Sequence, residues 1–581
     1  MAVKNLITDH IDIWTSAVKT KSTSGRGNSN KLELYGVKKL RELILDLAVR
    51  GKLVPQDPND EPASVLLERI AAEKAQLVKD KKIKKPKALP PINDNKPFQI
   101  PNNWGWSQLG FLTNYGVCDK LEPKDASPST WVLELEDVEK YTSRLLKKVR
   151  FEERVFKSTK NSFQKNDVIY GKLRPYLDKV LVADEDGACT TEMIPIRGYI
   201  GLMPEFIRLV LKTPYFIEYA NTSTHGMNLP RMGTDKARAA LFPLAPLNEQ
   251  HRIVAKVDEL MTLCDQLEQQ TEASIEAHQV LVTTLLDTLT NSADADELMQ
   301  NWARISEYFD TLFTTEESID QLKQTILQLA VMGKLVPQDP SDEPAAELLK
   351  RIAEEKAQLV KEKKIKKEKA LPPISEDEKP FELPNGWGFA HMQDLCELIT
   401  DGTHQTPKYT DTGRPFISAQ CVKPFRFMPE NCRYVSEEHY QAYIKNRNPE
   451  FRDILLSRVG AGIGEAAMID TDLEFAIYVS TGLLKPHKSS VMSEYLVLWL
   501  NSPLGRGFSE RNTLGKGVSQ GNLNLSLIRA FTVSLPPLQE QKRIIEQVNK
   551  LSDLCDLLKE RLQSVQLTQL SLTDVITEQV V

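Results

Sequence analysis

Few groups of residues in this sequence have types and spacings suited to catalysis. The glycine run Gly460-Ala-Gly462-Ile-Gly464 follows a β-type segment, but its spacing differs from a dinucleotide fingerprint and another strand, not a helix, follows it. Gly515-Lys516-Gly517 lacks the upstream glycine of a phosphate loop. The eight histidines are scattered and form no His-x-x-x-His ligand pair. We therefore expect a turn at 460–464, no catalytic centre and no metal site.

Cationic side chains stand at matched positions in two otherwise different regions. Lys172 and Arg458 each lie five residues after an aspartate, Asp167 or Asp453, that opens a β-type run. Each cation should thus stand where a strand ends, a position from which a side chain can reach a bound molecule.

Two polar, glycine-containing loops also correspond, at a constant offset of 291. His225-Gly-Met-Asn228 aligns with Lys516-Gly-Val-Ser519, and Arg231 aligns with Asn522. Polar side chains on such loops can hydrogen-bond to a bound molecule. If that molecule is DNA, arginine suits the edge of a guanine base, and asparagine or glutamine suits the edge of an adenine base. The alternative is that these are surface loops that only fold back on their domain.

The elements that hold these residues arise from a duplication. Residues 51–92 return at 333–374, with 35 of 42 positions identical. A second marker, 244–264, returns at 535–555, with Pro-Leu-x-Glu-Gln followed by a helical apolar pattern. We call these repeated parts, with the helices that continue them, the frame. The frame predicts a pseudo-twofold scaffold.

Between the markers lie two segments that barely resemble one another, 101–243 and 384–535, here called the first and second inserts. Short β-type runs and one closing helix in each predict a mixed α/β domain. The expected runs are 131–135, 167–170, 180–183 and 192–196 with helix 204–213, and 415–418, 453–456, 466–469 and 475–479 with helix 493–500. Trp104, Trp106, Trp387 and Phe389 should pin the inserts to the frame.

A long helix is expected after each insert, at 247–290 and from 538 to about 575. About 44 residues at 1.5 Å each span roughly 65 Å. The apolar stripes of the two helices can bury each other as an antiparallel coiled coil. We expect this coiled coil to separate the inserts.

Composition narrows the class of protein. The net charge is −6; the first insert has 20 Lys and Arg against 18 Asp and Glu, the second has 15 against 15, and the remaining residues carry −8. The lysine run 79–87 is either a solvated helix end or a phosphate contact.

Seven cysteines without a Cys-x-x-Cys argue against disulfides, and Cys264 and Cys555 should be core residues. Without a long apolar run or a signal peptide, we expect a cytoplasmic protein.

The GKLVPQDP…KALPPI frames, the divergent inserts and the returning PL-x-EQ-x-RI helices resemble the specificity subunit of type I restriction-modification enzymes, in the branch with a long N-terminal region. Local patterns agree: Asp401-Gly-Thr-His-Gln-Thr-Pro-Lys-Tyr409 in the second insert, and Asp167-Val-Ile-Tyr-Gly-Lys-Leu-Arg174 in the first. The first insert departs from the family because it has no clear Asp-Gly-Thr-His segment.

The resemblance implies a mixed α/β fold with two target recognition domains, each reading one half of a bipartite asymmetric DNA site. It divides the chain into 1–100 (N-terminal helical region), 101–243 (first recognition domain), 244–383 (central helical region with long helix 247–290 and frame 318–374), 384–535 (second recognition domain) and 536–581 (C-terminal helix). The residues expected to contact DNA are Tyr170, Lys172, Arg174, Tyr176, His225, Asn228, Arg231, Thr403, His404, Lys408, Tyr409, Arg458, Lys516, Ser519, Gln520, Asn522 and Asn524.

The same resemblance implies that the chain is not itself an enzyme and binds no cofactor. Two methylation subunits and the restriction subunits would supply S-adenosylmethionine, ATP and Mg chemistry, and the acidic frame would dock the methylation subunits. The alternatives are a stand-alone modular DNA-binding or coiled-coil scaffold protein and, against the missing motifs, a single-chain restriction or methylation enzyme.

Overall fold

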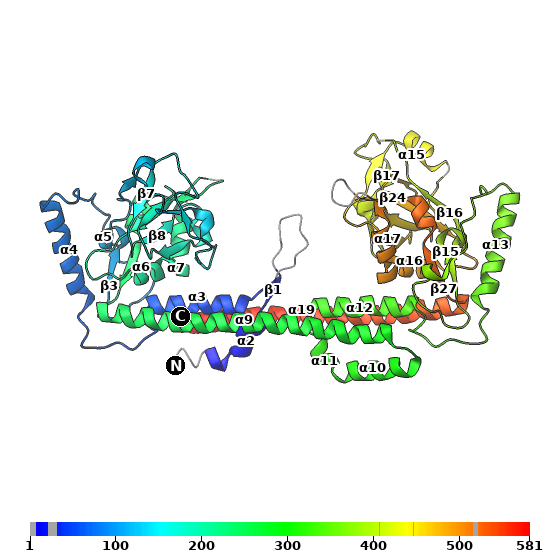
Figure 1. The fold of residues 1–581 in the computed structure, drawn as a ribbon, viewed down its shortest axis with the longest axis horizontal. Coiled ribbons are helices and arrows are strands. Elements are labelled where there is room, and N and C mark those ends of the chain that lie inside the picture. Colours follow the sequence, from blue (N-terminus) through cyan, green and yellow to red (C-terminus); the bar gives the residue numbers. More distant parts are fainter. Residues whose placement is uncertain are drawn as a thin grey trace. The chain divides into compact units, whose positions relative to one another are not determined.

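The computed structural model describes residues 7–20, 32–226, 228–405, 407–445, 447–514 and 521–580. The contacts divide the chain into two compact units, one formed by residues up to 274 together with those from 565 on, the other by 275–564. Each unit contains both helices and strands, so the predicted mixed α/β fold with long helices is confirmed (Figure 1). Among the described residues, no helix has the length and apolar character needed to cross a membrane.

Each insert is closed by its own first and last strands. In the first unit β3 (Gly105–Gln108) pairs antiparallel with β14 (Leu241–Leu244). In the second unit β15 (Gly388–His391) pairs in the same way with β27 (Thr532–Leu535). The two ends of an insert therefore leave it side by side, which lets the frame carry different inserts on the same attachment.

The first insert contains a five-stranded sheet in the order β4-β7-β10-β5-β6 and a three-stranded sheet in the order β11-β8-β9. Trp131, Phe163 and Ile169 belong to the core that these strands share. The strands are β4 (Lys120–Leu121), β5 (Trp131–Leu133), β6 (Val149–Arg150), β7 (Lys160–Phe163), β8 (Val168–Gly171), β9 (Val180–Val182), β10 (Gly187–Cys189), β11 (Met193–Ile196), β12 (Thr224–His225) and β13 (Arg231–Met232). The helices are α5 (Leu109–Leu112), α6 (Pro204–Leu211), α7 (Pro214–Thr222) and α8 (Thr234–Ala239).

The second insert has the sheets β16-β24-β21-β22 and β20-β17-β23. The strands are β16 (Cys396–Asp401), β17 (Arg414–Ile417), β18 (Val422–Lys423), β19 (Arg426–Phe427), β20 (Arg433–Val435), β21 (Ile454–Ser457), β22 (Ala466–Met468), β23 (Ala476–Ile477), β24 (Thr481–Pro486), β25 (Thr513–Leu514) and β26 (Asn522–Leu523). The helices are α14 (Met392–Leu395), α15 (Glu437–Ile444), α16 (Ser493–Asn501), α17 (Pro503–Arg511) and α18 (Leu525–Arg529). A tight turn at 460–464 joins β21 to β22, as predicted.

The two inserts share a topology that their sequences hide. A parallel pair joins β5 to β10 in the first insert and β17 to β23 in the second. Strand β8 lies between β11 and β9, as β21 lies between β24 and β22. The same backbone plan therefore carries different side chains.

The frame repeats one structural unit twice: α3 (Tyr35–Val49) with α4 (Ala63–Lys79), and α12 (Glu316–Val331) with α13 (Ala345–Lys361). Gly51 and Gly333 follow α3 and α12 with φ of +67° and +71°. A Cβ at either glycine would collide with the proline that opens the insert, Pro101 or Pro384. Glycine at these positions thus allows both the helix end and the close approach of the insert.

The long helices α9 (Leu247–Asn291) and α19 (Leu538–Val580) each contribute to both units, α9 beginning in the first and α19 in the second. Cys264 and Cys555 are both buried, as predicted. The remaining elements of the frame are β1 (Lys19–Thr20), β2 (Leu32–Glu33), α2 (Ile11–Ser16), α10 (Ala295–Glu307) and α11 (Phe309–Leu312).

Within each unit a short frame helix packs on parts of the long ones. In the second unit α12 runs antiparallel to α19, with Asp320 paired to Lys559 at 2.5 Å and Lys323 paired to Asp556 at 2.5 Å. In the first unit Tyr35 of α3 donates to Asp574 of α19 at 2.7 Å, and Arg41 pairs with Asp265 of α9 at 2.6 Å. Both units thus use the same kind of helix packing.

Candidate nucleic-acid interface

The Glu-Gln pair of the repeated Pro-Leu-x-Glu-Gln motif fixes each insert on its frame. Buried Glu249 accepts hydrogen bonds from Trp104 Nε1 at 2.9 Å and from Gln56 Nε2 at 2.5 Å. Its counterpart Glu540 accepts from Gln338 Nε2 at 3.1 Å. Burial raises the pKa of both carboxyl groups. The aromatic residue Trp104 therefore attaches the first insert to the frame, as the sequence predicted.

The glutamine that follows performs a second task. Gln250 accepts a hydrogen bond from the backbone N–H of Met203 at 3.2 Å, directly before α6. Gln541 accepts from the backbone N–H of Met492 at 2.9 Å, directly before α16. Both glutamines also donate to a carbonyl five residues upstream. The motif thus fixes the start of α6 in the first insert and of α16 in the second. The sequence predicted that each of these helices ends its insert, which is wrong, because α7 and α8 follow α6, and α17 and α18 follow α16.

An ion pair completes each attachment. Arg252 bonds Asp60 at 2.6 Å, and Arg543 bonds Asp342 at 2.7 Å. Asp60 is buried, and the side chain of Asp342 is 8% exposed. The hydrogen bond from Arg252 lowers the pKa of Asp60. We call these residues and the bonds between them the clamp. In the first unit the clamp consists of Gln56, Asp60, Glu249, Gln250 and Arg252, and in the second unit of their equivalents Gln338, Asp342, Glu540, Gln541 and Arg543.

The two loops predicted for the first insert come together at one edge. The backbone N–H of Arg174 donates to Pro230 O at 2.8 Å, and that of Met232 donates to Lys172 O at 3.0 Å. Leu173 forms a β-bridge with Arg231. The hairpin β12–β13 is thereby bonded along the segment that follows β8.

Several predicted side chains of this edge are exposed. Arg174 lies in the left-handed region with φ of +50°, before the short 3₁₀ turn Pro175–Leu177, and its guanidinium lies in solvent with one long contact to Asn228 O. Tyr176 and Asn228 are exposed, and Lys172 is half-buried. Arg231 is held by Glu192, with Nη2 at 3.0 Å from its carboxylate. The side chain of His225 lies outside the described part of the structure.

Tyr170 is not available for contact with DNA in this structure. Its side chain is 3% exposed and packs against Tyr115 and Phe216, and its hydroxyl contacts the sulfur of Met232. Burial raises its pKa well above the usual value. The prediction failed because Tyr170 belongs to β8, which is covered on both faces, whereas the exposed segment begins two residues later.

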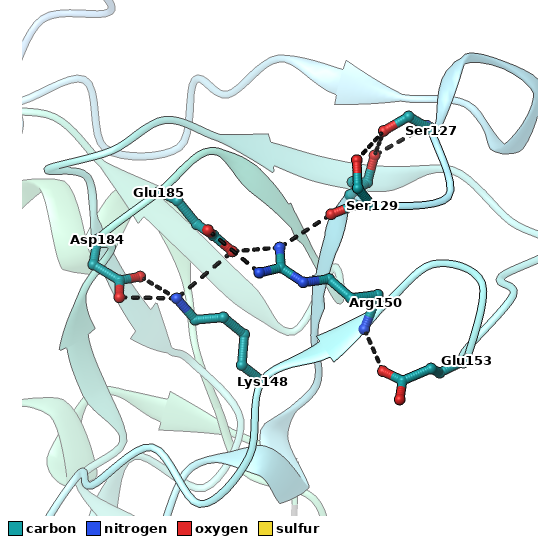
Figure 2. A network of polar contacts seen from close by, with 8 residues as sticks. Ser127, Ser129, Lys148, Arg150, Glu153, Asp184 and Glu185 are labelled. Atoms are coloured by element: carbon teal, nitrogen blue, oxygen red, sulfur yellow. Dashed lines mark hydrogen bonds and ion pairs between the residues drawn. The ribbon is translucent and has the colours of Figure 1, made fainter.

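Lys148, directly before β6, and Arg150, on β6, form a network of ion pairs with carboxylates (Figure 2). Lys148 bonds both carboxylate oxygens of Asp184 at 2.7 and 2.8 Å. Arg150 bonds Glu185 at 2.6 Å and the carbonyl of Ser129 at 3.0 Å. These cations are engaged by carboxylates of the same insert and are poor sites for phosphate.

Arg458, the equivalent of Lys172, is a positioning residue and not an exposed reader. It is 5% exposed, and Nε donates to Leu523 O at 2.9 Å. Its Nη1 bonds the Asp401 carboxylate and Val479 O. The prediction placed Arg458 correctly at the strand end but missed the buried carboxylate that Asp401 supplies from far away in the sequence.

Through Arg458 the Asp401–Tyr409 segment is tied to the hairpin β25–β26. Thr403 is buried, with its backbone N–H donating to Ile477 O at 3.0 Å, so it too is structural. His404 is exposed and contacts Asp401 at 3.2 Å. Lys408 and Tyr409 are also exposed.

Arg433 is a surface residue that the sequence did not single out. Its guanidinium stacks over the Tyr409 ring, 4.5 Å from the centroid. The two lie close because Thr410 forms a β-bridge with Tyr434, the residue after Arg433. The sequence offered no signal for this contact, since 24 residues separate the pair.

The last predicted loop of the second insert is described in part. Asn522 is exposed on β26 and forms a β-bridge with Val459, the equivalent of the bridge between Leu173 and Arg231. The Asn524 side chain caps α18 by accepting from the backbone N–H of Ser526 at 3.0 Å, which gives it a structural role in addition to its exposure. Lys516, Ser519 and Gln520 lie outside the described residues.

The aspartates Asp167 and Asp453, used only as markers in the sequence, are buried centres of charge pairing. Asp167 pairs with Arg197 at 2.7 Å. Asp453 pairs with Lys485 at 3.0 Å and Lys488 at 2.9 Å. These pairs hold the strand that precedes each exposed edge. The edges themselves present cationic, amide and aromatic groups, which can hydrogen-bond to base edges and phosphates.

Known proteins match the chain along its whole length. Residues 384–567 match the family described as type I restriction modification DNA specificity domain. The type I restriction enzyme EcoAI specificity subunit of Escherichia coli is 41% identical over 607 residues, covering 100% of this chain and 99% of that protein. The EcoEI specificity subunit of Escherichia coli is 41% identical over 606 residues, with the same coverage.

A solved structure has a similar fold. It is described as the structural basis of complex assembly and conformational transition of the type I R-M system, and it matches with a TM-score of 0.51 and 19% identity, covering 83% of this chain and 99% of the solved one. With the repeated frame and the paired inserts, the full-length identity of 41% settles the assignment: the chain belongs to the specificity subunits of type I restriction enzymes.

Proposed function

We propose that the two inserts are target recognition domains and that each reads one half of a bipartite, asymmetric DNA site. One observation carries this proposal: the clamp repeats the same bonds in both units, while the loops at the edges carry different side chains. A repeated support with unlike reading loops suits a site whose halves differ in sequence.

In the first insert the reading edge consists of the 172–176 segment and the hairpin β12–β13. In the second it consists of the 404–409 segment and the hairpin β25–β26. Arg174, Lys408 and Arg433 offer cationic donors, and Asn228 and Asn522 offer amide groups for base edges. Arg458 and Thr403 act behind this edge by holding the loops in place.

The chemistry of the system belongs to partner subunits in this proposal. The chain is non-catalytic, and methylation subunits dock on the frame, whose residues carry most of the negative charge. Restriction subunits join that complex, and S-adenosylmethionine, ATP and Mg bind to the partners. The long helices α9 and α19 fix the number of unread base pairs between the two half-sites.

The test is to map methylated bases in a bacterial strain that expresses the chain with its methylation subunit, and in the same strain after deletion of the chain. We expect methylated adenines in a split, asymmetric motif that disappears on deletion. A methylation pattern that does not depend on the chain would contradict the proposal and favour a scaffold without enzyme partners.

A further inference from the structure

Three metal-binding side chains converge in the second unit, away from the reading edge. Glu355 comes from α13 of the frame, Glu397 from β16, and His487 from the residue that follows β24. Their ligand atoms all lie within 4.8 Å of one another. His487 Nδ1 is 3.8 Å from Glu355 and 4.0 Å from Glu397.

His487 lacks the hydrogen bonds that a buried imidazole normally makes. Its side chain is 0% exposed, and neither ring nitrogen has a hydrogen-bond partner among the described residues. A buried polar group without a partner destabilises the fold, because it has lost its hydrogen bonds to water and gained none in return. The separations of 3.8 and 4.0 Å are too long for hydrogen bonds.

The same separations are close to those of ligands that share one ion. With metal–ligand bonds of about 2.0–2.2 Å, two ligands of a tetrahedral ion stand roughly 3.3–3.6 Å apart, so the side chains of this cluster would move closer together on binding one. Glu355 is oriented by Ser489, whose hydroxyl donates to it at 3.0 Å, a support typical of metal ligands.

Nearby lysines are engaged with other groups. Lys356 donates to the carbonyl of Gln393 at 2.7 Å, and Lys488 donates to the carbonyl of Phe451 at 2.8 Å and pairs with Asp453 at 2.9 Å. Two carboxylates therefore face one imidazole, and a cation between them would satisfy all three groups.

The first unit provides an internal comparison. Tyr199 occupies the place of His487, since its backbone N–H donates to Leu112 O as that of His487 donates to Leu395 O, both at 3.0 Å. Glu73 corresponds to Glu355 at the offset of 282 and accepts a hydrogen bond from the backbone N–H of Ile200 at 2.8 Å. Asn114 corresponds to Glu397, since each lies two residues after the residue whose carbonyl accepts this bond, Leu112 or Leu395. The first unit thus has one carboxylate and no imidazole at this place.

We propose that Glu355, Glu397 and His487 bind one zinc ion, which ties the frame helix α13 to the second recognition domain. One imidazole nitrogen and two carboxylate oxygens form a ligand set that zinc accepts, with water as a further ligand. The site is structural: it joins three segments that lie far apart in the sequence. The sequence did not reveal it, because its ligands are 42 and 90 residues apart and form no local motif.

The test is a titration of the full-length chain, freed of metal with a chelator, by zinc chloride in an isothermal titration calorimeter. We expect one zinc ion per chain, and at least tenfold weaker binding in each of the variants Glu355→Gln and Glu397→Gln. The matched control is Glu73→Gln, which changes the same frame position in the first unit and should bind zinc as the unmodified chain does.

Zinc should also raise the thermal unfolding temperature of the unmodified chain and of Glu73→Gln, and raise it less in Glu355→Gln and Glu397→Gln. Circular dichroism of the metal-free variants verifies that they are folded. The proposal is overturned if the unmodified chain takes up no zinc, or if folded Glu355→Gln and Glu397→Gln bind it with unchanged stoichiometry and affinity.

Discussion

The two units of this protein attach their recognition domains with the same bonds and then present different edges. In both units an arginine of the long helix pairs with an aspartate of the frame, at 2.6 and 2.7 Å, and the glutamine of the motif accepts a hydrogen bond from the backbone directly before α6 or α16. The edges differ at equivalent positions: Lys172 is half-buried, whereas Arg458 is buried and bonded to Asp401. In the proposed function, attachment and reading are therefore separate tasks of separate residues.

Of the substitutions considered, we expect the replacement of Arg458 to reduce the stability of its domain most. Replacing Arg458 by alanine leaves Asp401 buried without its main partner, which should cost about 3–5 kcal/mol. We expect hydrogen exchange in β21 and β24 to become at least roughly 100-fold faster if these strands open locally. The second domain should then no longer recognise its half-site, because its reading edge is not held in place.

Lys172→Ala is the matched control at the equivalent position. Because Lys172 is only half-buried, its loss should leave hydrogen exchange in β8 and β11 within a few-fold of the unmodified chain. Equal acceleration in the two variants would show that the buried bonds of Arg458 have no special role in the second domain.

The clamp predicts a smaller effect that is the same in both units. Arg252→Ala and Arg543→Ala each remove the partner of an aspartate whose side chain is at most 8% exposed, and each should cost about 1.5–3 kcal/mol. Hydrogen exchange in residues 51–62 and 333–344, measured on the two variants in parallel, should increase by similar factors. A large change in one unit alone would break the equivalence of the two attachments.

The smallest expected effect concerns acid. The hydrogen bond from Arg252 lowers the pKa of Asp60, so Asp60 contributes stability above its unfolded pKa of about 3.9, and this is lost as the pH falls through the folded value. The difference in unfolding free energy between the unmodified chain and Asp60→Asn should therefore shrink below about pH 4. A difference that grew with acid would contradict the assigned ion pair.

Much of the fold could be predicted from the sequence because the information was local or repeated. The β-type runs expected from residue type match the strands β5, β8, β9, β11, β17 and β21 to β23. The duplicated frame predicted two equivalent structural units. The offset of 291 also identified the hairpins β12–β13 and β25–β26 as equivalents. Each forms one β-bridge to the segment that follows β8 or β21.

The roles of single side chains could not be predicted, because they depend on partners far away in the sequence. Arg458 is bonded inside the domain to Asp401, which lies 57 residues earlier in the sequence. Tyr170 is buried because β9 and β11 flank its strand and α6 packs against it. Glu355, Glu397 and His487 meet only after α13, β16 and β24 have packed together.

The central claim is that each recognition domain reads one half-site independently on a common attachment. The most direct measurement replaces residues 101–243 with the corresponding domain of another specificity subunit and maps the methylated bases in cells that also express the methylation subunit. Our account predicts a split motif in which one half changes and the other half and the spacer length stay the same. A change in both halves, or in neither, would contradict it.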